Sequence, residues 1–449
     1  MIDRALCAFE WRYGSPEMKN LFTVFNVVLT YIKVESALMD ALAEAGMVPR
    51  ECKGALEKCS ELVKPLEVYE LEGEIGHDIA ALAYLLGERC GECGKYVHLG
   101  ATSYDIVDTA WALIIREALG VVKRKLKSII GGLAELSVKY VDALTPGRTH
   151  GQHALPITFG FKFANYVYEL TRSYERLLEL EKRVVRLKMS GAVGTMAAWG
   201  NKGFLVEGYV ARALGLEPHS ISTQVAPRDG FAELVSALAI LASQLDRLAL
   251  EVRELSRPEI GEMFEASERV GSSTMPHKRN PVLSERISGL AKVLRGLVVT
   301  ALENIPLMHE RDLTNSSSER LLIPHAFLAV DQMLEDAIKL LEVLYVDTAT
   351  ARRNLDLTRG AIYSELLMVK LVEKGWARHE AHRKISTLVK SMKPGETLRE
   401  AVLRDPELSR LFAERELEEL MKPENYLGST RLIVARAIEY SKRVLERGE

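Results

Sequence analysis

The segment GSSTMPHKRNP at residues 271–281 brings hydroxyl, cationic and amide side chains together in a short stretch. It offers the hydroxyls of two serines, the ammonium group of Lys278 and the amide of Asn280. A hydroxyl beside a fixed cation can take up a proton while the cation stabilises the negative charge that develops. Because glycine and proline interrupt helices, the segment is predicted to be a loop between two helices. A serine before a helix is also typical of an N-cap, which is the structural alternative for Ser272.

Four other polar stretches have a similarly unusual composition. They are HLGATSYD (98–105), GRTHGQHALP (147–156), STQVAPRD (222–229) and HERDLTNSSSER (309–320). Together they supply histidine, serine, threonine, glutamine and several arginines but few acids, which suits a polyanionic small molecule carrying phosphate or carboxylates. The chain has no Gly-rich phosphate loop, so side chains and helix N-termini would hold a phosphate. No spacing of His, Asp and Glu matches a metal site, and no metal or organic cofactor is expected.

Long helices must position these stretches. Apolar residues recur at i, i+3, i+4 and i+7 spacing over five segments, 106–142, 158–189, 230–256, 282–303 and 316–346. We find no series of alternating strands, and the polar stretches fall at the ends of the helices. The prediction is an all-α fold with an N-terminal helical domain (1–105), a central long-helix bundle (106–350) and a C-terminal helical domain (351–449). Helices of this length are often shared between subunits.

Composition and charge exclude some partners. The chain has 449 residues and a formal charge of −3, which gives no basic field for nucleic acid or an anionic membrane. Its apolar runs are too short to span a bilayer, and the first residues lack the pattern of a signal peptide. We therefore expect a cytoplasmic protein that binds neither nucleic acid nor membrane.

All five cysteines lie before residue 94, and two of them form the pattern Cys90-x-x-Cys93. Such a pair could bind zinc, act in redox chemistry or take part in disulfides, and the thiols could also be reduced and partly buried. The chain has only four glutamines but many Glu, Lys and Arg, a balance typical of heat-adapted proteins. Because intracellular disulfides occur in hyperthermophiles, a structural role stays open.

GSSTMPHKRNP resembles the signature of the fumarase/aspartase superfamily, whose members eliminate fumarate from succinyl compounds. The other four stretches follow in the superfamily's order and spacing, so the resemblance covers nearly the whole chain. The residues MPHK (275–278) are similar to adenylosuccinate lyases and to carboxymuconate cycloisomerases. Arg12-Tyr13 and the set Arg311, Ser316 and Arg320 favour the adenylosuccinate lyases. A cycloisomerase and a non-catalytic helical scaffold remain the alternatives.

The resemblance implies a β-elimination that releases fumarate from adenylosuccinate, giving AMP, and from succinylaminoimidazole carboxamide ribotide, giving AICAR. Ser273 would be the base and His150 the acid that protonates the leaving nitrogen. Lys278 would stabilise the dianionic intermediate. His77 would be a second catalytic histidine, at the substrate phosphate, although Gly76 stands where the resemblance leads us to expect a charged or amide residue. Glu285 is expected to form an ion pair with Lys278 or His150.

The residues expected to bind the substrate are spread over all the polar stretches and the N-terminus. They are Arg12, Tyr13, Asp78, His98, Thr102, Ser103, Gln224, Asn280, Arg311, Ser316 and Arg320. Secondary candidates are Arg148, His153, Arg228 and His277, whereas Asp105 is expected to be a helix N-cap and the remaining histidines to be surface or core residues. The predicted helix 106–142 would separate His98 from His150 by roughly 50 Å. A single substrate could then meet both only if different subunits contribute them. The resemblance implies a homotetramer whose active sites combine several chains and whose tetramer core is the central bundle.

Overall fold

The structure is a computed structural model that describes residues 6–266, 275 and 277–448. The chain divides into two compact units. Unit 1 comprises Met1–Leu126, Ser173–Leu245 and Ile287–Asp336, and unit 2 comprises Lys127–Arg172, Asp246–Arg286 and Ala337–Glu449. This division cuts through the long helices, whereas the predicted three-domain division follows the order of the chain and stays a prediction.

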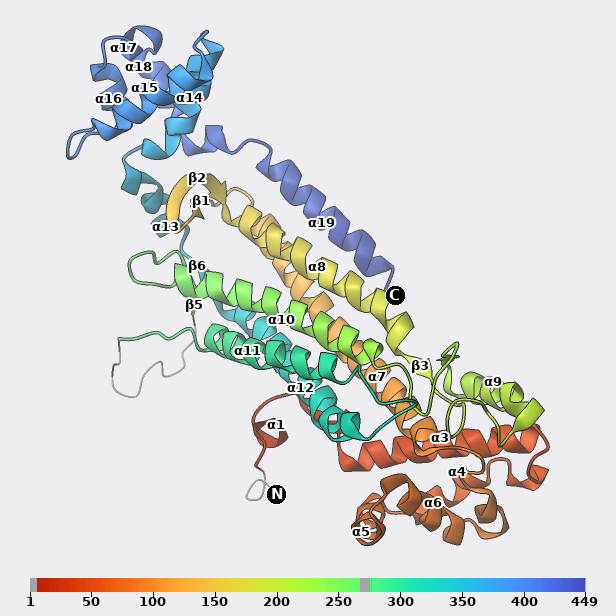
Figure 1. Cartoon of the computed structure of the whole chain (residues 1–449). Helices are drawn as coiled ribbons and strands as arrows, with labels where there is room; N and C mark the ends of the chain where they lie inside the picture. Colours follow the sequence, from red (N-terminus) through yellow and green to blue (C-terminus); the bar gives the residue numbers. More distant parts are fainter. Residues whose placement is uncertain (1–5, 267–274, 276, 449) are drawn as a thin grey trace. The chain divides into compact units, whose positions relative to one another are not determined.

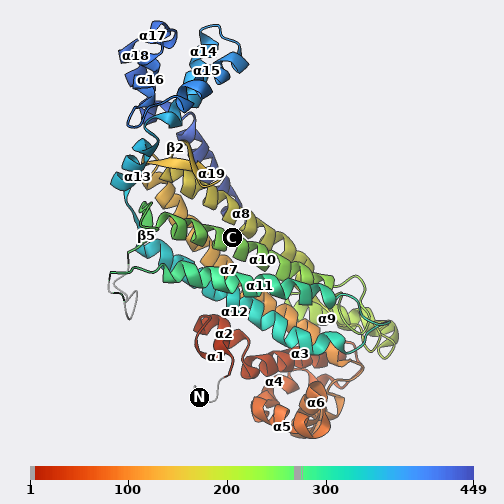
Figure 2. The same cartoon turned by 60° about the vertical axis from the view of Figure 1, so that its left-hand side comes forward.

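Five long helices each contribute residues to both units. They are α7 (Ser103–Lys139), α8 (Phe159–Val184), α10 (Asp229–Leu255), α11 (Val282–Glu303) and α12 (Thr314–Val343). Their bounds agree with the five predicted segments to within a few residues, and the predicted all-α fold is confirmed. Within unit 1, α7, α10, α11 and α12 run side by side (Figures 1 and 2). Among the described residues, no helix is both long enough and apolar enough to cross a membrane.

Shorter elements complete unit 1. They are α1 (Ala8–Trp11), α2 (Pro16–Leu21), α3 (Val24–Glu44), α4 (Ala55–Cys59), α5 (Pro65–Ile75), α6 (Asp78–Arg89), α9 (Gly203–Leu214), the 3₁₀ helices η2 (Arg50–Cys52), η3 (Ser60–Leu62), η4 (Gly91–Tyr96) and η5 (Gly200–Lys202), and the paired strands β3 (Arg186–Leu187) and β4 (Glu217–Pro218). The core includes an apolar stripe of α7 in which Ile106, Ala110 and Val122 have no exposed surface. The stripe has the spacing expected of a helix that is buried on one side.

Unit 2 contains two further small sheets and a cluster of short helices. Its elements are β1 (Leu144–Thr149), β2 (Gln152–Thr158), β5 (Met263–Glu265), β6 (Leu344–Val346), α13 (Thr348–Leu355), α14 (Ser364–Glu373), α15 (Arg378–Lys390), α16 (Leu398–Arg404), α17 (Leu408–Leu411), α18 (Glu414–Leu420), α19 (Thr430–Glu446) and the 3₁₀ helices η6 (Asp356–Thr358), η7 (Ala361–Tyr363) and η8 (Pro423–Tyr426). Leu367, Leu371, Ile385 and Phe412 belong to the core that holds α14 to α18 together. This cluster positions the groove discussed below.

The stretch GRTHGQHALP contains two short strands that were not predicted from the sequence. Strands β1 and β2 form an antiparallel hairpin in which Arg148 pairs with His153 and Thr149 with Gln152. The two loop residues have positive φ angles, 56° for His150 and 73° for Gly151. A two-residue hairpin loop of this kind follows the natural twist of the strands. The hairpin is short and contains prolines and glycines, so its sequence lacks a clear alternating pattern.

Two disulfides cross-link the part of unit 1 between α3 and α7. Cys52 is bonded to Cys93 and Cys59 to Cys90, whereas Cys7 is free. The structural role of the cysteines is thus confirmed over the reduced and zinc alternatives. The two cysteines of the Cys90-x-x-Cys93 pattern bond to different partners rather than to each other.

Gly76 ends helix α5 and His77 begins helix α6, which explains the glycine that the resemblance did not lead us to expect. Gly76 has φ 76° and ψ 18°, the left-handed conformation in which glycine commonly follows a helix. His77 is the N-cap of α6, since its Nδ1 accepts a hydrogen bond from the backbone N–H of Ala80. The sharp turn at Gly76 therefore sets where the imidazole of His77 lies.

Candidate active site

A hollow of about 190 Å³ in unit 1 is lined by the end of α5 and by the starts of α6, α7 and α12. It brings together six of the predicted site residues, namely His77, Asp78, Ser103, Arg311, Ser316 and Arg320. These residues come from three stretches that are far apart in the sequence. We refer to this hollow as the anion pocket, for the reasons that follow.

A chain of polar contacts crosses one side of the anion pocket. The Nε2 atom of His77 lies 3.1 Å from the hydroxyl of Ser103. The carboxylate of Asp78 lies 3.5 Å from Nδ1 of His77, and its other oxygen accepts a hydrogen bond of 3.0 Å from Arg320. Asp78 therefore fixes Arg320, and the backbone N–H of Ala80 holds His77, while the outer atoms of both side chains stay exposed. Such an arrangement can hold a phosphate or carboxylate group through charge-assisted hydrogen bonds.

Arg311 is the most telling residue of the anion pocket. Its guanidinium lies 3.7 Å from the centre of the Tyr104 ring and donates a hydrogen bond of 3.1 Å to Gln224. Its buried Nε and Nη2 atoms have no hydrogen-bond partner among the described residues. Leaving buried charged donors without partners costs free energy, so this guanidinium is suited to an anionic ligand.

A buried network supports the pocket from behind. Asp108 accepts hydrogen bonds from the Arg228 guanidinium at 2.8 and 2.9 Å and from the backbone N–H of Ala226 at 2.7 Å. Glu319 lies 3.1 Å from Nε of Arg228 and is 2% exposed. Burial raises the pKa of Glu319 to about 7, although the charge of Arg228 opposes the rise. One guanidinium thus faces two carboxylates, and Asp108 takes its direct hydrogen bonds.

The two carboxylates raise the pKa of Arg228, as expected for a cation beside acids. Burial lowers the pKa of Arg228, but the charges of Asp108 and Glu319 outweigh burial and raise it. The pKa of Glu319 is raised, although it also lies beside Arg228, because Glu319 is the second acid beside a single cation. Arg228 was only a secondary candidate, and its contacts are those of a supporting residue.

His98 lies away from the lining residues of the anion pocket and is held by a buried acid. Its Nδ1 is 2.6 Å from Glu35, whose side chain is fully buried. Burial lowers the pKa of His98, but the hydrogen bond and charge of Glu35 outweigh burial, so the pKa is raised. His98 has a φ of 61°, and positive φ at a non-glycine residue costs free energy that functional sites often tolerate.

Thr102 and Asp105 have structural contacts. The backbone N–H of Thr102 donates to Asp105 at 2.7 Å, and Asp105 also accepts a hydrogen bond of 2.7 Å from the buried amine of Lys188. Asp105 was expected to be the N-cap residue, but it lies inside the first turn of α7 and satisfies the N-terminus from there. The predicted binding role of Thr102 stays a prediction.

In unit 2, His150 lies at the exposed tip of the β1–β2 hairpin. The base of the hairpin is anchored by Glu262, which accepts hydrogen bonds from Arg148 at 3.0 Å and Thr145 at 2.8 Å. Burial lowers the pKa of His153, and the charge of Arg148 lowers it further. Arg148 therefore has an anchoring role, with His153 as its partner in the strand pairing, whereas His150 is exposed.

The opening motif is only partly described. Ser272 and Ser273 lie outside the described residues, so the predicted role of Ser273 stays a prediction. His277 and Lys278 are exposed, Asn280 is half-buried, and Glu285 is exposed in the first turn of α11. The expected ion pair of Glu285 with Lys278 or His150 stays a prediction, and all three residues are exposed in this chain.

Arg12 and Tyr13 do not line the anion pocket. The guanidinium of Arg12 lies 5.9 Å from the centre of the Tyr13 ring. The residues that follow are tied to α12, because the backbone N–H of Gly14 donates to Gln332 at 2.9 Å. Within this chain, Arg12 and Tyr13 are not part of the pocket lining, and their binding role stays a prediction.

Four residues that the sequence did not single out support the candidate site. Glu35 and Asp108 provide buried acids, and Glu319 and Tyr31 line the anion pocket. Glu319 directly precedes Arg320 and follows Ser316 by three residues, so helical spacing could have pointed to it. Glu35 and Tyr31 come from α3. Nothing in their local sequence indicates that α3 contacts His98 or borders the anion pocket.

The arrangement can bind an anion and exchange protons with it. Arginine side chains, histidine and hydroxyls line the anion pocket, and His150 and Lys278 supply further polar groups in unit 2. In the described part of the chain, no group of three or more His, Cys, Asp and Glu side chains is placed to bind a metal.

Comparison with known proteins shows similarity along nearly the whole chain. A family profile described as "Lyase" matches residues 15–296, and one described as "Adenylosuccinate lyase C-terminus" matches residues 360–437. The chain is 46% identical to an adenylosuccinate lyase of Pyrococcus horikoshii over 449 residues, which cover 99% of this chain and 100% of the relative. It is 43% identical to that of Methanothermobacter thermautotrophicus, with 98% and 100% covered.

Solved structures agree with this similarity. A 3-carboxy-cis,cis-muconate lactonizing enzyme from Pseudomonas putida matches with a TM-score of 0.89 and 32% identity, covering 98% of this chain and 100% of that one. A fumarate lyase from Mesorhizobium sp. BNC1 matches with a TM-score of 0.88 and 31% identity, covering 97% and 99%. Sequence identity is higher to the adenylosuccinate lyases, and their C-terminal profile matches as well. The chain therefore belongs to the adenylosuccinate lyase family of the fumarase/aspartase superfamily.

Proposed function

We propose that this protein cleaves adenylosuccinate to AMP and fumarate, and succinylaminoimidazole carboxamide ribotide to AICAR and fumarate. The observation that carries the proposal is the Arg311 guanidinium, which has two unpartnered buried nitrogens in a pocket that it shares with Arg320, His77 and Ser103. Both substrates carry a phosphate and two carboxylates, which match this chemistry. The relatives from Pyrococcus horikoshii and Methanothermobacter thermautotrophicus are named adenylosuccinate lyases.

The reaction is a β-elimination in which the substrate gives one proton to the protein, receives another from it, and loses its C–N bond as a C=C bond forms. Ser273 would remove the Cβ proton next to a carboxylate, and the electron pair left on carbon would spread onto that carboxylate as a dianion. Lys278 would stabilise the dianion because opposite charges attract strongly in a water-poor site. The C–N bond then breaks, and His150 would give its proton to the leaving nitrogen. These steps need no metal or organic cofactor.

The anion pocket would hold one anionic part of the substrate, with Arg320, His77 and Ser103 as donors. Its volume of about 190 Å³ suits a phosphate with part of a ribose rather than a whole nucleotide. Asp78 would keep Arg320 in place, and the hydroxyl of Tyr104 already donates a hydrogen bond of 3.1 Å to Ser316. The rest of the substrate would extend out of the pocket.

We further propose that the protein is a cytoplasmic homotetramer with active sites built from several chains. Helix α7 has 37 residues, which at about 1.5 Å per residue make about 55 Å. The stretch with His98 precedes this helix and the hairpin with His150 follows it, so one substrate is too small to reach both in one chain. Exposed apolar residues on α10 and α11 support association, since isolated apolar faces favour burial against a partner. They include Ile240, Leu250, Val293, Val299 and Leu302.

The decisive test is to add adenylosuccinate to the purified protein and follow absorbance at the purine band. The proposal expects a change with time as AMP forms, together with fumarate in equal amount. A flat trace would contradict it and favour the non-catalytic scaffold. A flat trace combined with turnover of carboxymuconate would favour the cycloisomerase.

Subunit mixing tests the composite sites. Inactive Ser273→Ala and inactive His150→Gln proteins are dissociated, mixed and reassembled, and the hybrids are verified by mass spectrometry. Partial recovery of activity is expected, because some sites would then contain both intact residues. Verified hybrids without any activity would show that one chain supplies both groups.

A further inference from the structure

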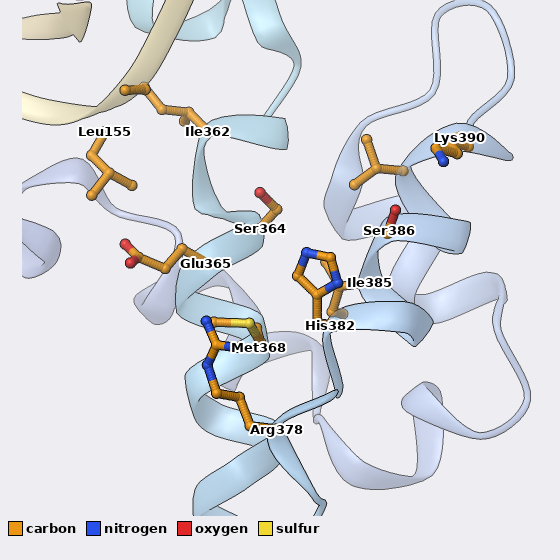
Figure 3. Close-up of a pocket in the computed structure, with 12 residues that line it drawn as sticks. Leu155, Ile362, Ser364, Glu365, Met368, Arg378, His382, Ile385, Ser386 and Lys390 are labelled. Atoms are coloured by element: carbon orange, nitrogen blue, oxygen red, sulfur yellow. The ribbon is translucent and has the colours of Figure 1, made fainter. Parts of the chain in front are cut away.

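Unit 2 contains a larger hollow, of about 560 Å³, that none of the functions above uses. It lies between helices α14 and α15 and is bordered by strand β2 (Figure 3). Leu155 of β2, Met368 of α14, and Ile385 and Val389 of α15 contribute apolar surface. We call this hollow the α14–α15 groove. Its apolar surface suits a ligand with an apolar body.

One wall of the groove carries a line of polar side chains at helical spacing. Arg378, His382, Ser386 and Lys390 follow one another at four-residue intervals along α15, so they share one face of that helix. The line is about 18 Å long at 1.5 Å per residue. Figure 3 shows His382 and Ser386 on the α15 side and Ser364 and Glu365 on the α14 side.

The cations of this line are not neutralised within the described part of the chain. Arg378, His382 and Lys390 form no ion pair there, although all three line the groove. Cations nearby are paired: Lys384 of the same helix lies 3.0 Å from Asp405 and 2.8 Å from Glu407.

The single acid of the groove is already engaged. Glu365 accepts a hydrogen bond of 2.9 Å from the hydroxyl of Tyr426. Three basic side chains therefore face one carboxylate that has its own donor, and the groove carries an excess of positive charge. An anionic group next to the apolar surface would complement both features.

We propose that the α14–α15 groove is a binding site for a small organic anion with an apolar body, such as an aromatic phosphomonoester. Arg378 or Lys390 would hold the anionic group, helped by the hydroxyls of Ser364 and Ser386. The apolar body would rest on Met368 and Ile385. Because Leu155 belongs to the strand that follows the His150 turn, a bound ligand would also contact that hairpin.

The experiment titrates 1-naphthyl phosphate into the full-length protein and measures the dissociation constant by saturation-transfer difference NMR. Inorganic phosphate and neutral 1-naphthol are titrated in parallel. The proposal expects the naphthyl phosphate to bind more tightly than either, because only that probe uses both the cations and the apolar surface. Binding of 1-naphthol that is as tight would overturn it, and so would no measurable binding of the phosphate ester.

Variants locate the binding site of the probe. The double variant Arg378→Gln/Lys390→Gln removes the cation at both ends of the line and should raise the dissociation constant at least tenfold, the effect of losing a charge-assisted hydrogen bond. The control Arg383→Gln/Arg410→Gln removes the same charge from exposed positions outside the groove and should leave it unchanged. Equal effects of the two double variants would overturn the proposal.

A third variant separates this groove from the anion pocket. In Arg320→Gln, the naphthyl phosphate should bind as in the unaltered protein, since Arg320 belongs to the pocket of unit 1. Loss of binding in this variant would place the probe in the anion pocket and overturn the groove assignment. The outcome does not depend on whether the chain cleaves adenylosuccinate, because every arm measures binding alone.

Discussion

The two units hold their candidate site residues in different ways. In unit 1, Asp78, Arg311 and Arg320 line a pocket, and buried acids behind it fix the positions of their neighbours. In unit 2, His150 lies exposed at a hairpin tip and Lys278 is exposed ahead of α11. The difference indicates that one chain forms a binding pocket by itself, whereas the groups proposed for proton transfer need surroundings from elsewhere. In the proposed tetramer, a second chain would supply them.

The largest expected effect is on kcat, when the exposed His150 of unit 2 is replaced. His150→Gln should lower kcat by about 10²–10⁴-fold, the usual contribution of general acid catalysis, and leave KM almost unchanged. Steady-state kinetics with adenylosuccinate measures both parameters. A substrate with a better leaving group should recover part of the rate, because it needs less protonation. A kcat within tenfold of the unaltered enzyme would show that the exposed histidine does no chemistry.

The disulfides should account for much of the stability of unit 1. Reduction should destabilise the protein by about 3–4 kcal/mol for the first bond and by less for the second, since the second loop is nested in the first. The melting temperature should fall by several degrees, without loss of activity at moderate temperature. Mass spectrometry of unreduced, alkylated protein should find one free thiol, that of Cys7. Five free thiols in fresh protein would contradict the bonds.

Glu319 should give unit 1 a pH-dependent stability. Its pKa rises from an ordinary 4.5 to about 7 on folding, so the native state keeps a proton that the unfolded chain releases. The contribution to unfolding free energy therefore falls as pH rises from about 4.5 to about 7 and is constant above that, for a total of about 3 kcal/mol.

The variant Glu319→Gln cannot release this proton. From pH 5 to pH 8 its unfolding free energy should therefore gain about 2–3 kcal/mol relative to the unaltered protein. Urea unfolding at several pH values measures the difference, and titrations elsewhere in the chain cancel in it. Parallel curves for the two proteins would mean that Glu319 keeps an ordinary pKa.

The smallest expected effect is on KM, when Arg320 of the anion pocket is replaced. Arg320→Gln should raise KM about tenfold with little change in kcat, because one exposed charge-assisted hydrogen bond to the bound substrate is lost. Arg124→Gln is the matched control, since Arg124 is a similarly exposed arginine of unit 1 that pairs with Glu17. A lowered kcat with an unchanged KM in Arg320→Gln would show that Arg320 acts in the chemical step. The pocket of unit 1 would then not be a binding site alone.

Much of the fold could be predicted because the helical signal is strong. The 37 residues of α7 repeat an apolar stripe many times, so errors at its ends do not affect its identity. The β1–β2 hairpin was missed because it has few residues, several of them proline or glycine, and its stability depends on Glu262, more than 100 positions away. Cysteine spacing likewise could not choose partners, because connectivity depends on how α3 to α7 fold together.

The candidate site was predictable only in part, for the same reason. Polar residues such as Arg311 and Arg320 stand out because they occur in unusual stretches at helix ends. The buried acids Glu35 and Asp108 do not, because each is a single charge within an ordinary helix. Their role depends on contacts with residues distant in the sequence, His98 for Glu35 and Arg228 for Asp108, and only the tertiary structure brings these residues together.

The nested order of the disulfides also determines what happens when the backbone is cut. The Cys59–Cys90 bond lies inside the loop closed by Cys52–Cys93, and His77 lies inside both. A single protease cut between residues 59 and 90, for example at the exposed end of α5 near Glu74, would leave two fragments joined through sulfur at two points. Without reductant such a nicked chain would migrate as one species in denaturing electrophoresis. The segment that carries His77 therefore stays covalently attached on both sides of a break.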